Sequence, residues 1–571
     1  MPRMSASEAF VETLVANGVT DVFGIVGSAY MDALDLFPPA GIRFWSVAHE
    51  QNAAHMADGY SRASGRHGVC IAQNGPGVTN FVTAIAAAYW AHSPVVCITP
   101  EAGTATAGLG GFQETEQLPI FSKITKAQLH VTRPDRIAEL TQRAFTLAAL
   151  ERGPTQLNIP RDLFYGELDQ AIPRPPAIRR GPGASESLDE AARALAGARF
   201  PVILAGGGVV MSGATKPLVA LAEKLSAPVV ASYLHNDAFP ASHPLACGPL
   251  GYLGSKAAMR ILAQADVVLA LGSRLGPFGT LPQYEIDYWP RGAKVVQVDS
   301  DLRVLGLTRP VDVAIHGDAA AATVELLARI ERAGELAAAS SAPARLAEVA
   351  RQKQAWEREL DTLSDREGTP IPPRRALREL ERALPPGAMV TTDIGNVCSV
   401  ANSYLRFEES PSFFAAMGFG NCGYAFPTAL GAKVARPERP AVAYVGDGAW
   451  GMSLHETLTA VRERIPVVAV VFANRQWGAE KKNQIDFFAG RAVASELENP
   501  SFAAIARAMG AQGISVERAG DVGDALRSAL RSEQPTVLEI HLDQELADPF
   551  RRDALKRPRR LLEKYRSYTV E

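Results

Sequence analysis

A glycine-rich segment, Gly446–Gly451, carries one carboxylate, Asp447, and is followed 27 positions later (447 to 474) by the amide side chain of Asn474. The apolar run at residues 465–472, just before Asn474, is typical of a buried parallel strand, and residues 452–464 between them predict a helix. A glycine turn that opens a helix exposes unpaired N–H groups, which suit a phosphate. Carboxylate and amide oxygens are ligands that Mg²⁺ prefers alongside phosphate and water. This spacing therefore predicts a metal-bridged diphosphate site.

Two simpler interpretations stand beside this chemistry. A Gly-Asp-Gly sequence is by itself often a plain turn, and only Asn474 at the end of the next strand sharpens the prediction. A second carboxylate, Glu50, follows a strand that ends near Ala48 and opens a predicted helix. A Glu in the first turn is favoured by the helix dipole, so helix capping accounts for it without any catalytic role.

Composition bounds the class of protein. A chain of 571 residues is too long to fold around a single hydrophobic core, so three to four domains are predicted. Its content of 47% hydrophobic and 21% charged residues is ordinary for a globular protein. A net charge of −3 gives no reason to expect nucleic acid or an anionic membrane as partner. The N-terminus has no apolar signal core and no run reaches transmembrane length. Five scattered cysteines without CxxC spacing argue against disulfides and zinc, so we expect a cytoplasmic protein.

An internal repeat indicates the domain organisation. A glycine turn, a helix and a Pro-Val-Val strand occur three times, starting at Gly75, Gly206 and Gly446. Each copy is the α-then-β half of a βαβ unit, so the fold class predicted is α/β with three doubly wound, mostly parallel-sheet domains. Ligands in such sheets bind beyond the carboxyl ends of the strands.

Linker-like composition separates these units. Residues 173–187 are dense in Pro, Gly and Arg, residues 333–344 are rich in Ala and Ser, and residues 368–373 contain three prolines. These shifts place the domains at 1–175, 188–335 and 370–545, with a charged connecting helix at 345–366 and a basic tail at 546–571.

The chemistry-bearing segments resemble those of thiamine diphosphate (ThDP) enzymes of the acetolactate synthase-like superfamily. The resemblance rests on Gly446–Gly448 with Asn474, on the Glu-x-Asn-Ala-Ala block that starts at Glu50, and on further segments in the same order: Phe23–Gly27, Gln73–Asn80, Phe112–Glu114, Asp393–Asn396 and Gly418–Pro427. It implies that the side chains of Asp447 and Asn474 and the backbone carbonyl of Gln476 hold Mg²⁺. The family usually has two consecutive Asn where this chain has Ala473-Asn474.

The same resemblance implies the other roles. Glu50 would bond the aminopyrimidine ring and promote loss of the thiazolium C2 proton, which requires a buried carboxyl with a raised pKa. Gln113 and Asn396 would contact the reacting groups, and His49 is a candidate proton carrier. The position of Cys422 is a Met in acetolactate synthases, which suggests a differently shaped pocket. The implied cofactor contacts are Gly27, Asn74, Gly75, Gly395, Asn396, Gly420, Cys422, Gly446, Asp447, Gly448, Ala449 and Asn474.

Within the superfamily the chain most resembles the sulfoacetaldehyde acetyltransferases, through residues 110–114, 419–428 and 474–484. The resemblance implies that sulfoacetaldehyde and phosphate are converted to acetyl phosphate and sulfite. Two anionic substrates suit a basic loop, so Arg475, Lys481 and Lys482, with Phe112, are the predicted substrate contacts. For each lysine a solvated basic face is the alternative.

Partners and rival functions follow from the same family. Its members pair the first and third domains between subunits, which implies a homodimer or homotetramer with the active site at the interface. One rival is a carboligase of the acetolactate synthase type that acts on pyruvate or a related 2-oxo acid and often carries FAD on the middle domain. The other is a catalytically inactive subunit with the ThDP fold, against which intact Glu50, Asp447 and Asn474 argue.

Overall fold

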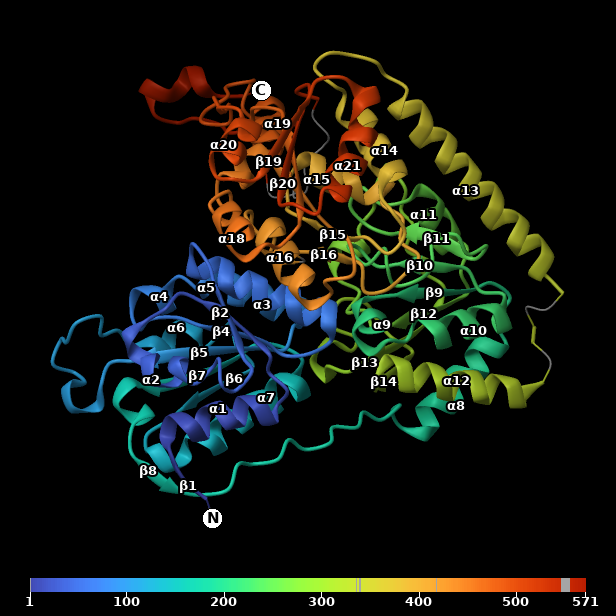
Figure 1. The fold of residues 1–571 in the computed structure, drawn as a ribbon. Coiled ribbons are helices and arrows are strands. Elements are labelled where there is room, and N and C mark those ends of the chain that lie inside the picture. Colours follow the sequence, from blue (N-terminus) through green and yellow to red (C-terminus); the bar gives the residue numbers. More distant parts are fainter. Residues whose placement is uncertain (1, 335, 338–339, 417, 546–554, 571) are drawn as a thin grey trace.

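The computed structural model describes residues 2–570 except 335, 338–339, 417 and 546–554. Three separate six-stranded sheets, parallel throughout, each lie between helices (Figure 1). The predicted fold class, α/β with three doubly wound parallel sheets, is confirmed. Among the described residues, no helix is both long and apolar enough to cross a membrane.

The first sheet has the strand order β3-β2-β4-β5-β7-β6. Helices α1 and α7 pack together on one face, and α3 and α5 pack together on the other. Its strands are β2 (Asp21–Gly24), β3 (Arg43–Ser46), β4 (Gly68–Ile71), β5 (Val95–Glu101), β6 (Ala127–His130) and β7 (Thr155–Pro160), and a small antiparallel pair is β1 (Arg3–Ser5) with β8 (Glu167–Asp169). Its helices are α1 (Ala6–Ala16), α2 (Met31–Asp35), α3 (Glu50–Ser64), α4 (Pro76–Thr79), α5 (Val82–Ala91), α6 (Gln117–Phe121) and α7 (Ile137–Glu151).

The middle sheet has the order β11-β10-β9-β12-β13-β14 and its own apolar core. Its strands are β9 (Pro201–Ala205), β10 (Val229–Ala231), β11 (Ala246–Pro249), β12 (Val267–Leu271), β13 (Lys294–Asp299) and β14 (Val313–His316). Its helices are α8 (Ser185–Ala196), α9 (Gly207–Ser212), α10 (Thr215–Leu225), α11 (Lys256–Leu262) and α12 (Ala319–Ala333). The long helix α13 (Ala342–Ser364), predicted at 345–366, connects this domain to the third and runs along the outside of both (Figure 1).

The third sheet has the order β16-β15-β17-β18-β20-β19. Its strands are β15 (Met389–Thr392), β16 (Phe413–Ala415), β17 (Ala441–Gly446), β18 (Val468–Ala473), β19 (Gln512–Val516) and β20 (Thr536–His541). Its helices are α14 (Pro373–Ala383), α15 (Asn396–Tyr404), α16 (Ala425–Ala435), α17 (Asp447–Trp450), α18 (Glu456–Glu463), α19 (Gly478–Phe487), α20 (Phe502–Ala508) and α21 (Val522–Arg531).

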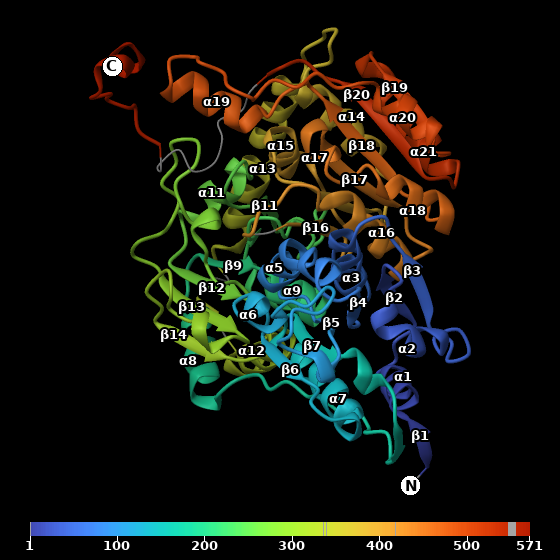
Figure 2. The same cartoon turned by 90° about the vertical axis from the view of Figure 1, so that its left-hand side faces the viewer.

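Two sequence predictions need adjustment. The helix predicted at 452–464 begins only at Glu456, because the chain turns through residues 451–455 after the short helix α17. Gly451, which ends α17, explains the break, since glycine disfavours helix continuation. Residues 546–554 and 571 of the predicted basic tail lie outside the described residues. The rest of the tail carries an exposed 3₁₀ turn at Glu563–Tyr568 and stands apart from the three sheets (Figure 2).

The first and third domains share one core through helices α3 and α16. The two helices approach so closely that a Cβ on Gly59 would lie 2.0 Å from the carbonyl oxygen of Thr428. A Cβ on Gly431 would lie 1.9 Å from the carbonyl oxygen of Met56. This backbone-to-backbone contact requires glycine and fixes the start of α3 relative to the third domain.

Candidate functional site

Asp447 stands where β17 ends and α17 begins, at the carboxyl edge of the third sheet. Its side chain is buried, and Oδ1 accepts a hydrogen bond from the N–H of Gly448 at 2.9 Å. Oδ2 accepts from the N–H of Arg475 at 2.6 Å and from Nδ2 of Asn499 at 3.3 Å. Among the described residues no cationic side chain forms an ion pair with it, and burial raises its pKa to about 6.

Asn474 and Gln476 complete this edge. Both side chains are buried, and the Oε1 atom of Gln476 has no hydrogen-bond partner. The part of the chain that the structure describes has no group of three His, Cys, Asp or Glu that could hold a metal, so a metal bound at Asp447 would need amide and backbone oxygens as its other protein ligands. A buried carboxylate without a counter-ion beside amide oxygens fits Mg²⁺, which takes few protein ligands beside phosphate. The predicted metal residues therefore lie together.

The glycine turn itself suits a phosphate group. Gly448 cannot be replaced without a clash, since its Cβ would lie 2.7 Å from the ring of Trp477. Ala449 is buried in the short helix α17, and Gly446 is the residue just before that helix. The N–H of Gly448 bonds Asp447, and the other N–H groups at the start of this short helix suit an anion.

Two neighbouring loops hold the other predicted cofactor contacts of this domain. Gly395 and Gly420 adopt positive φ angles of +154° and +71°, and Asn396 opens α15. Cys422 is half-buried with Sγ 3.6 Å from the carbonyl oxygen of Ile394, and burial raises the pKa of its thiol to about 12. The thiol is therefore protonated and packs as a small apolar group.

Asp393, which was not predicted as a site residue, fixes the loop around Cys422. Its Oδ1 accepts from the N–H groups of Tyr424 at 2.7 Å and Ala425 at 3.1 Å, where α16 begins. Its Oδ2 is buried without a partner, and burial raises the pKa of the carboxyl to about 7.

A second cluster forms around Glu50 at the carboxyl edge of the first sheet. Glu50 is the first residue of α3, and its Oε2 accepts a hydrogen bond from Nδ2 of Asn80 at 2.9 Å. A Cβ on Gly77 would lie 3.2 Å from its Oε1, so the glycine loop closes directly over the carboxylate. His49 is the N-cap of α3, since its Nδ1 accepts from the N–H of Gln51 at 3.2 Å.

The remaining predicted residues of the first domain pack against one another. Nδ2 of Asn74 donates to the backbone oxygen of Gln113 at 2.9 Å, and Nε2 of Gln73 donates to its Oε1 at 2.9 Å. Two glycines are required because the chain approaches its neighbours closely. A Cβ on Gly75 would lie 2.5 Å from the backbone oxygen of Gln113, and a Cβ on Gly27 would lie 2.4 Å from the Oε1 of Gln73. Phe112, the neighbour of Gln113 in sequence, is 85% exposed.

The basic loop is only partly free. Lys481 pairs with Glu496 at 2.7 Å, and Lys482 pairs with Asp486 at 2.7 Å. The Arg475 side chain is exposed and forms no ion pair among the described residues, while its backbone N–H bonds Asp447. Arg475 is thus the cation of this loop that is free to meet an anion.

Within the described part of one chain, Glu50 and Asp447 lie in two separate clusters. The recorded side-chain partner of Glu50 is Asn80, and no hydrogen bond or ion pair in the described ranges links Glu50 to Asp447. Large apolar side chains are exposed beside both clusters: Val26, Leu109 and Phe112 in the first domain, and Phe419, Met452 and Leu458 in the third.

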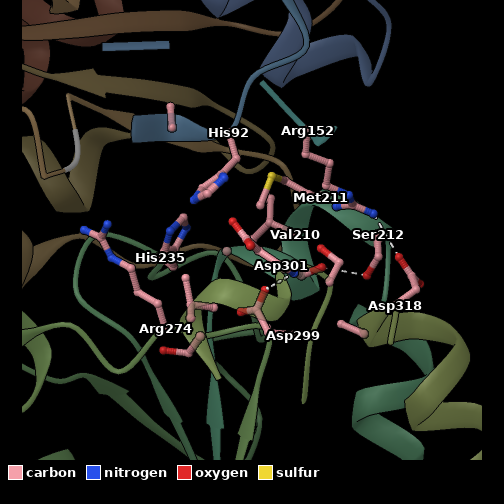
Figure 3. Close-up of a pocket in the computed structure, with 18 of the residues that line it drawn as sticks. His92, Arg152, Val210, Met211, Ser212, His235, Arg274, Asp299, Asp301 and Asp318 are labelled. Atoms are coloured by element: carbon pink, nitrogen blue, oxygen red, sulfur yellow. Dashed lines mark hydrogen bonds and ion pairs between the residues drawn. The ribbon is translucent and has the colours of Figure 1, made fainter. Parts of the chain in front are cut away.

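A cavity of about 1690 Å³ lies elsewhere, between the middle domain and its two neighbours. Figure 3 shows His235, Arg274 and Asp299 of the middle domain facing His92 and Arg152 of the first. Its floor includes the Gly207–Gly208 turn and the ends of β9 and β13. Arginines and a glycine turn suit a phosphate, and a carboxylate at a strand end suits a hydroxyl. Sequence reasoning missed this cavity because its lining comes from three domains.

Comparison with known proteins gives matches along nearly the whole chain. Family models for thiamine pyrophosphate enzymes match as the N-terminal TPP binding domain at residues 4–120, the central domain at 188–327 and the C-terminal TPP binding domain at 393–540. The chain is 61% identical to a sulfoacetaldehyde acetyltransferase of Castellaniella defragrans, over 99% of this chain and 98% of that protein. It is 58% identical to one of Alcaligenes xylosoxydans xylosoxydans, over 99% and 98%. A probable acetolactate synthase large subunit of Methanocaldococcus jannaschii is 34% identical, over 96% and 93%.

Proposed function

This chain belongs to the thiamine pyrophosphate enzyme family, and we propose that it converts sulfoacetaldehyde and inorganic phosphate to acetyl phosphate and sulfite. The observation that carries the proposal is the difference in sequence identity between two groups of relatives that each match at least 95% of this chain. Sulfoacetaldehyde acetyltransferases match at 44–61%, whereas the acetolactate synthases match at 31–34%. The mechanism proposed below uses the residues that the two clusters bring together.

The diphosphate end of the cofactor would be held by the third domain. The side chains of Asp447 and Asn474 and the backbone carbonyl of Gln476 would bind Mg²⁺, while the N–H groups of the glycine turn contact the phosphates. The uncompensated buried carboxylate of Asp447 supports this assignment. When bound, thiamine diphosphate supplies a carbon that stabilises negative charge next to the substrate carbonyl carbon.

Glu50 would hold and transfer the proton that activates the cofactor, at its carboxyl oxygen. Asn80 orients that carboxylate, and Gly77 lies against its Oε1, while the Glu50 side chain as a whole is half-buried. Gln113 and Asn396 would contact the substrate. His49 remains a candidate proton carrier, although its Nδ1 caps α3.

Anion recognition would fall mainly on Arg475. Its exposed guanidinium follows the metal ligand Asn474 directly and offers a fork of donors that suits a sulfonate or a phosphate. Lys481 and Lys482 are held in ion pairs with Glu496 and Asp486 and would add little net positive potential, and the exposed Phe112 would cover the substrate.

A second copy of the chain would complete the site. Glu50 and Asp447 form separate clusters in one chain, and apolar side chains are exposed beside each. We therefore place the active site between subunits of a homodimer or homotetramer, where those side chains become buried. The five cysteines are all free, which is consistent with the reducing cytoplasm as its location.

The test is an assay of purified protein with ThDP, Mg²⁺, sulfoacetaldehyde and phosphate, following sulfite and acetyl phosphate together. Formation of both products in equal amounts, only with phosphate present, is expected. Acetolactate from pyruvate without sulfite from sulfoacetaldehyde would replace the proposal with the carboligase.

A further inference from the structure

The carboxylate of Glu456 is fully buried at the start of α18, yet its contacts are mainly with another domain. Its Oε1 accepts from the N–H groups of Ala48 at 3.2 Å and His49 at 3.1 Å. The same oxygen accepts from Nδ2 of Asn52 at 3.0 Å, and Oε2 accepts from the hydroxyl of Thr459 at 2.5 Å. Each donor except Thr459 lies in the first domain, either in the two residues just before α3 or in its first turn.

These contacts surround Glu50 on both sides in sequence. The N–H groups at the start of a helix have no partner inside it, and a negative charge there is favoured by the helix dipole. Glu456 binds the two N–H groups just before Glu50 and the side chain of Asn52 just after it. The backbone that carries Glu50 is therefore fixed by a carboxylate of the third domain.

The sequence position of Glu456 gives this contact a functional meaning. It lies in the segment that starts with Asp447 at β17 and continues through α17 and the turn at 451–455. We propose that Glu456 is a positioning residue for Glu50, holding the first turn of α3 so that the Glu50 carboxylate meets the cofactor. This inference rests on the role proposed above for Glu50.

The same helix provides a matched control at its other end. Glu463 also bridges α18 to the first domain, because its Oε2 accepts from Arg43 at 3.1 Å. Arg43 lies at the start of β3, away from Glu50. Glu463→Gln thus removes a carboxylate that also lies on α18 and also contacts the first domain. It leaves the contacts of Glu456 with the start of α3 intact.

The first experiment needs no cofactor. Amide hydrogen–deuterium exchange of the unloaded protein is compared for wild type, Glu456→Gln and Glu463→Gln. We expect at least tenfold faster exchange at residues 48–52 in Glu456→Gln alone, since a lost charge-assisted hydrogen bond opens that turn. Unchanged exchange there would overturn the proposal.

The second experiment measures how fast ThDP bound to each variant exchanges its thiazolium C2 proton with D₂O, without substrate. We expect a 10- to 100-fold slower exchange in Glu456→Gln with ThDP affinity within about threefold of wild type. A purely structural role would weaken folding or cofactor binding and leave the exchange rate of the bound cofactor unchanged. Because no substrate is present, failure of the acetyltransferase assignment would not affect this result.

A double variant separates positioning from an independent effect. If Glu456 acts through Glu50, Glu50→Gln with Glu456→Gln should exchange C2 no more slowly than Glu50→Gln alone. A further loss equal to that of the single Glu456 variant would contradict the proposal. Should Glu456→Gln fail to fold, Thr459→Val removes one hydrogen bond to the same carboxylate and should slow C2 exchange by a smaller factor. Wild-type exchange in Thr459→Val would then contradict it.

Discussion

The amide of Asn80 donates a hydrogen bond to the carboxylate of Glu50 at 2.9 Å. Asn80 follows the glycine turn after β4, whereas Glu50 opens the helix after β3. The pair therefore joins two loops at the carboxyl edge of the first sheet and defines which rotamer the Glu50 carboxylate adopts. The proton transfer proposed for Glu50 would depend on that geometry.

Replacement of Glu50 by Gln should leave cofactor binding within about threefold of wild type and lower kcat about 10²- to 10⁴-fold. The amide has nearly the same shape but cannot take up the proton. Fluorescence titration with ThDP and a steady-state assay measure the two effects separately. Glu12→Gln on the exposed surface of α1 is the control, and near-normal turnover of Glu50→Gln would refute the catalytic assignment.

Binding of Mg²⁺ and ThDP should weaken as the pH falls below 6. Burial raises the pKa of Asp447 to about 6, so protons compete with the metal for the carboxylate below that value. At pH 5.5 only about a quarter of a carboxyl with this pKa is ionised, so calorimetric titration should show about fourfold lower affinity at pH 5.5 than at pH 7.5. Asp447→Asn should bind weakly at both values, and a variant that retains full Mg²⁺-dependent affinity would contradict the site.

Acid should destabilise the unloaded protein through its buried histidines. Burial lowers the pKa of His55 and His235 to about 3 and of His92 to about 4, whereas each is near 6.5 when unfolded. Below pH 6.5 these histidines bind protons in the unfolded chain but stay neutral in the folded one. The free energy of unfolding is therefore highest above pH 6.5 and decreases as the pH falls below that value. His55→Gln should reduce the slope of stability against pH by up to about 1.4 kcal/mol per unit below pH 6. Denaturant melts between pH 7.5 and 5 would reveal it, and an unchanged slope would contradict burial of the neutral ring.

The buried carboxyl of Asp393 should make the protein less stable as the pH rises, which is opposite to the effect of the buried histidines. Burial raises the pKa of Asp393 to about 7, so its ionisation costs stability above that pH, and the cost disappears as pH falls toward 4. The Asp393→Asn variant should therefore melt at a higher temperature than wild type at pH 8, with the difference shrinking toward pH 5. Equal melting temperatures at pH 8 would show that the carboxyl is not desolvated.

Gly431→Ala should destabilise the contact between the first and third domains. The added Cβ would lie 1.9 Å from the carbonyl oxygen of Met56, so the two helices must separate, at a cost of about 1–3 kcal/mol. Thermal melting measures this loss. Gly292→Ala is the control because a Cβ there meets nothing within 4 Å, and equal melting of the two variants would argue against the close packing.

The sequence by itself determined the local features. The repeated glycine turn, helix and apolar strand predicted three parallel-sheet domains, and the sheets confirm them. The positions of Asp447 and Asn474 followed from the same pattern, since residues after neighbouring parallel strands emerge at one edge of a sheet. The repeated units and the positions of the polar residues could be predicted because they depend on the periodicity and spacing of residues within one segment of the sequence.

Only the tertiary structure decided the partners of those residues. Glu456 meets Ala48 and Asn52 across more than 400 positions of sequence, and neither the length nor the composition of the intervening chain predicts that contact. The sequence equally left open that Lys481 pairs with Glu496. Buried polar groups must find hydrogen-bond partners wherever packing brings them. The partners of the candidate site residues are therefore set by how the domains pack, and the residues themselves by the sequence.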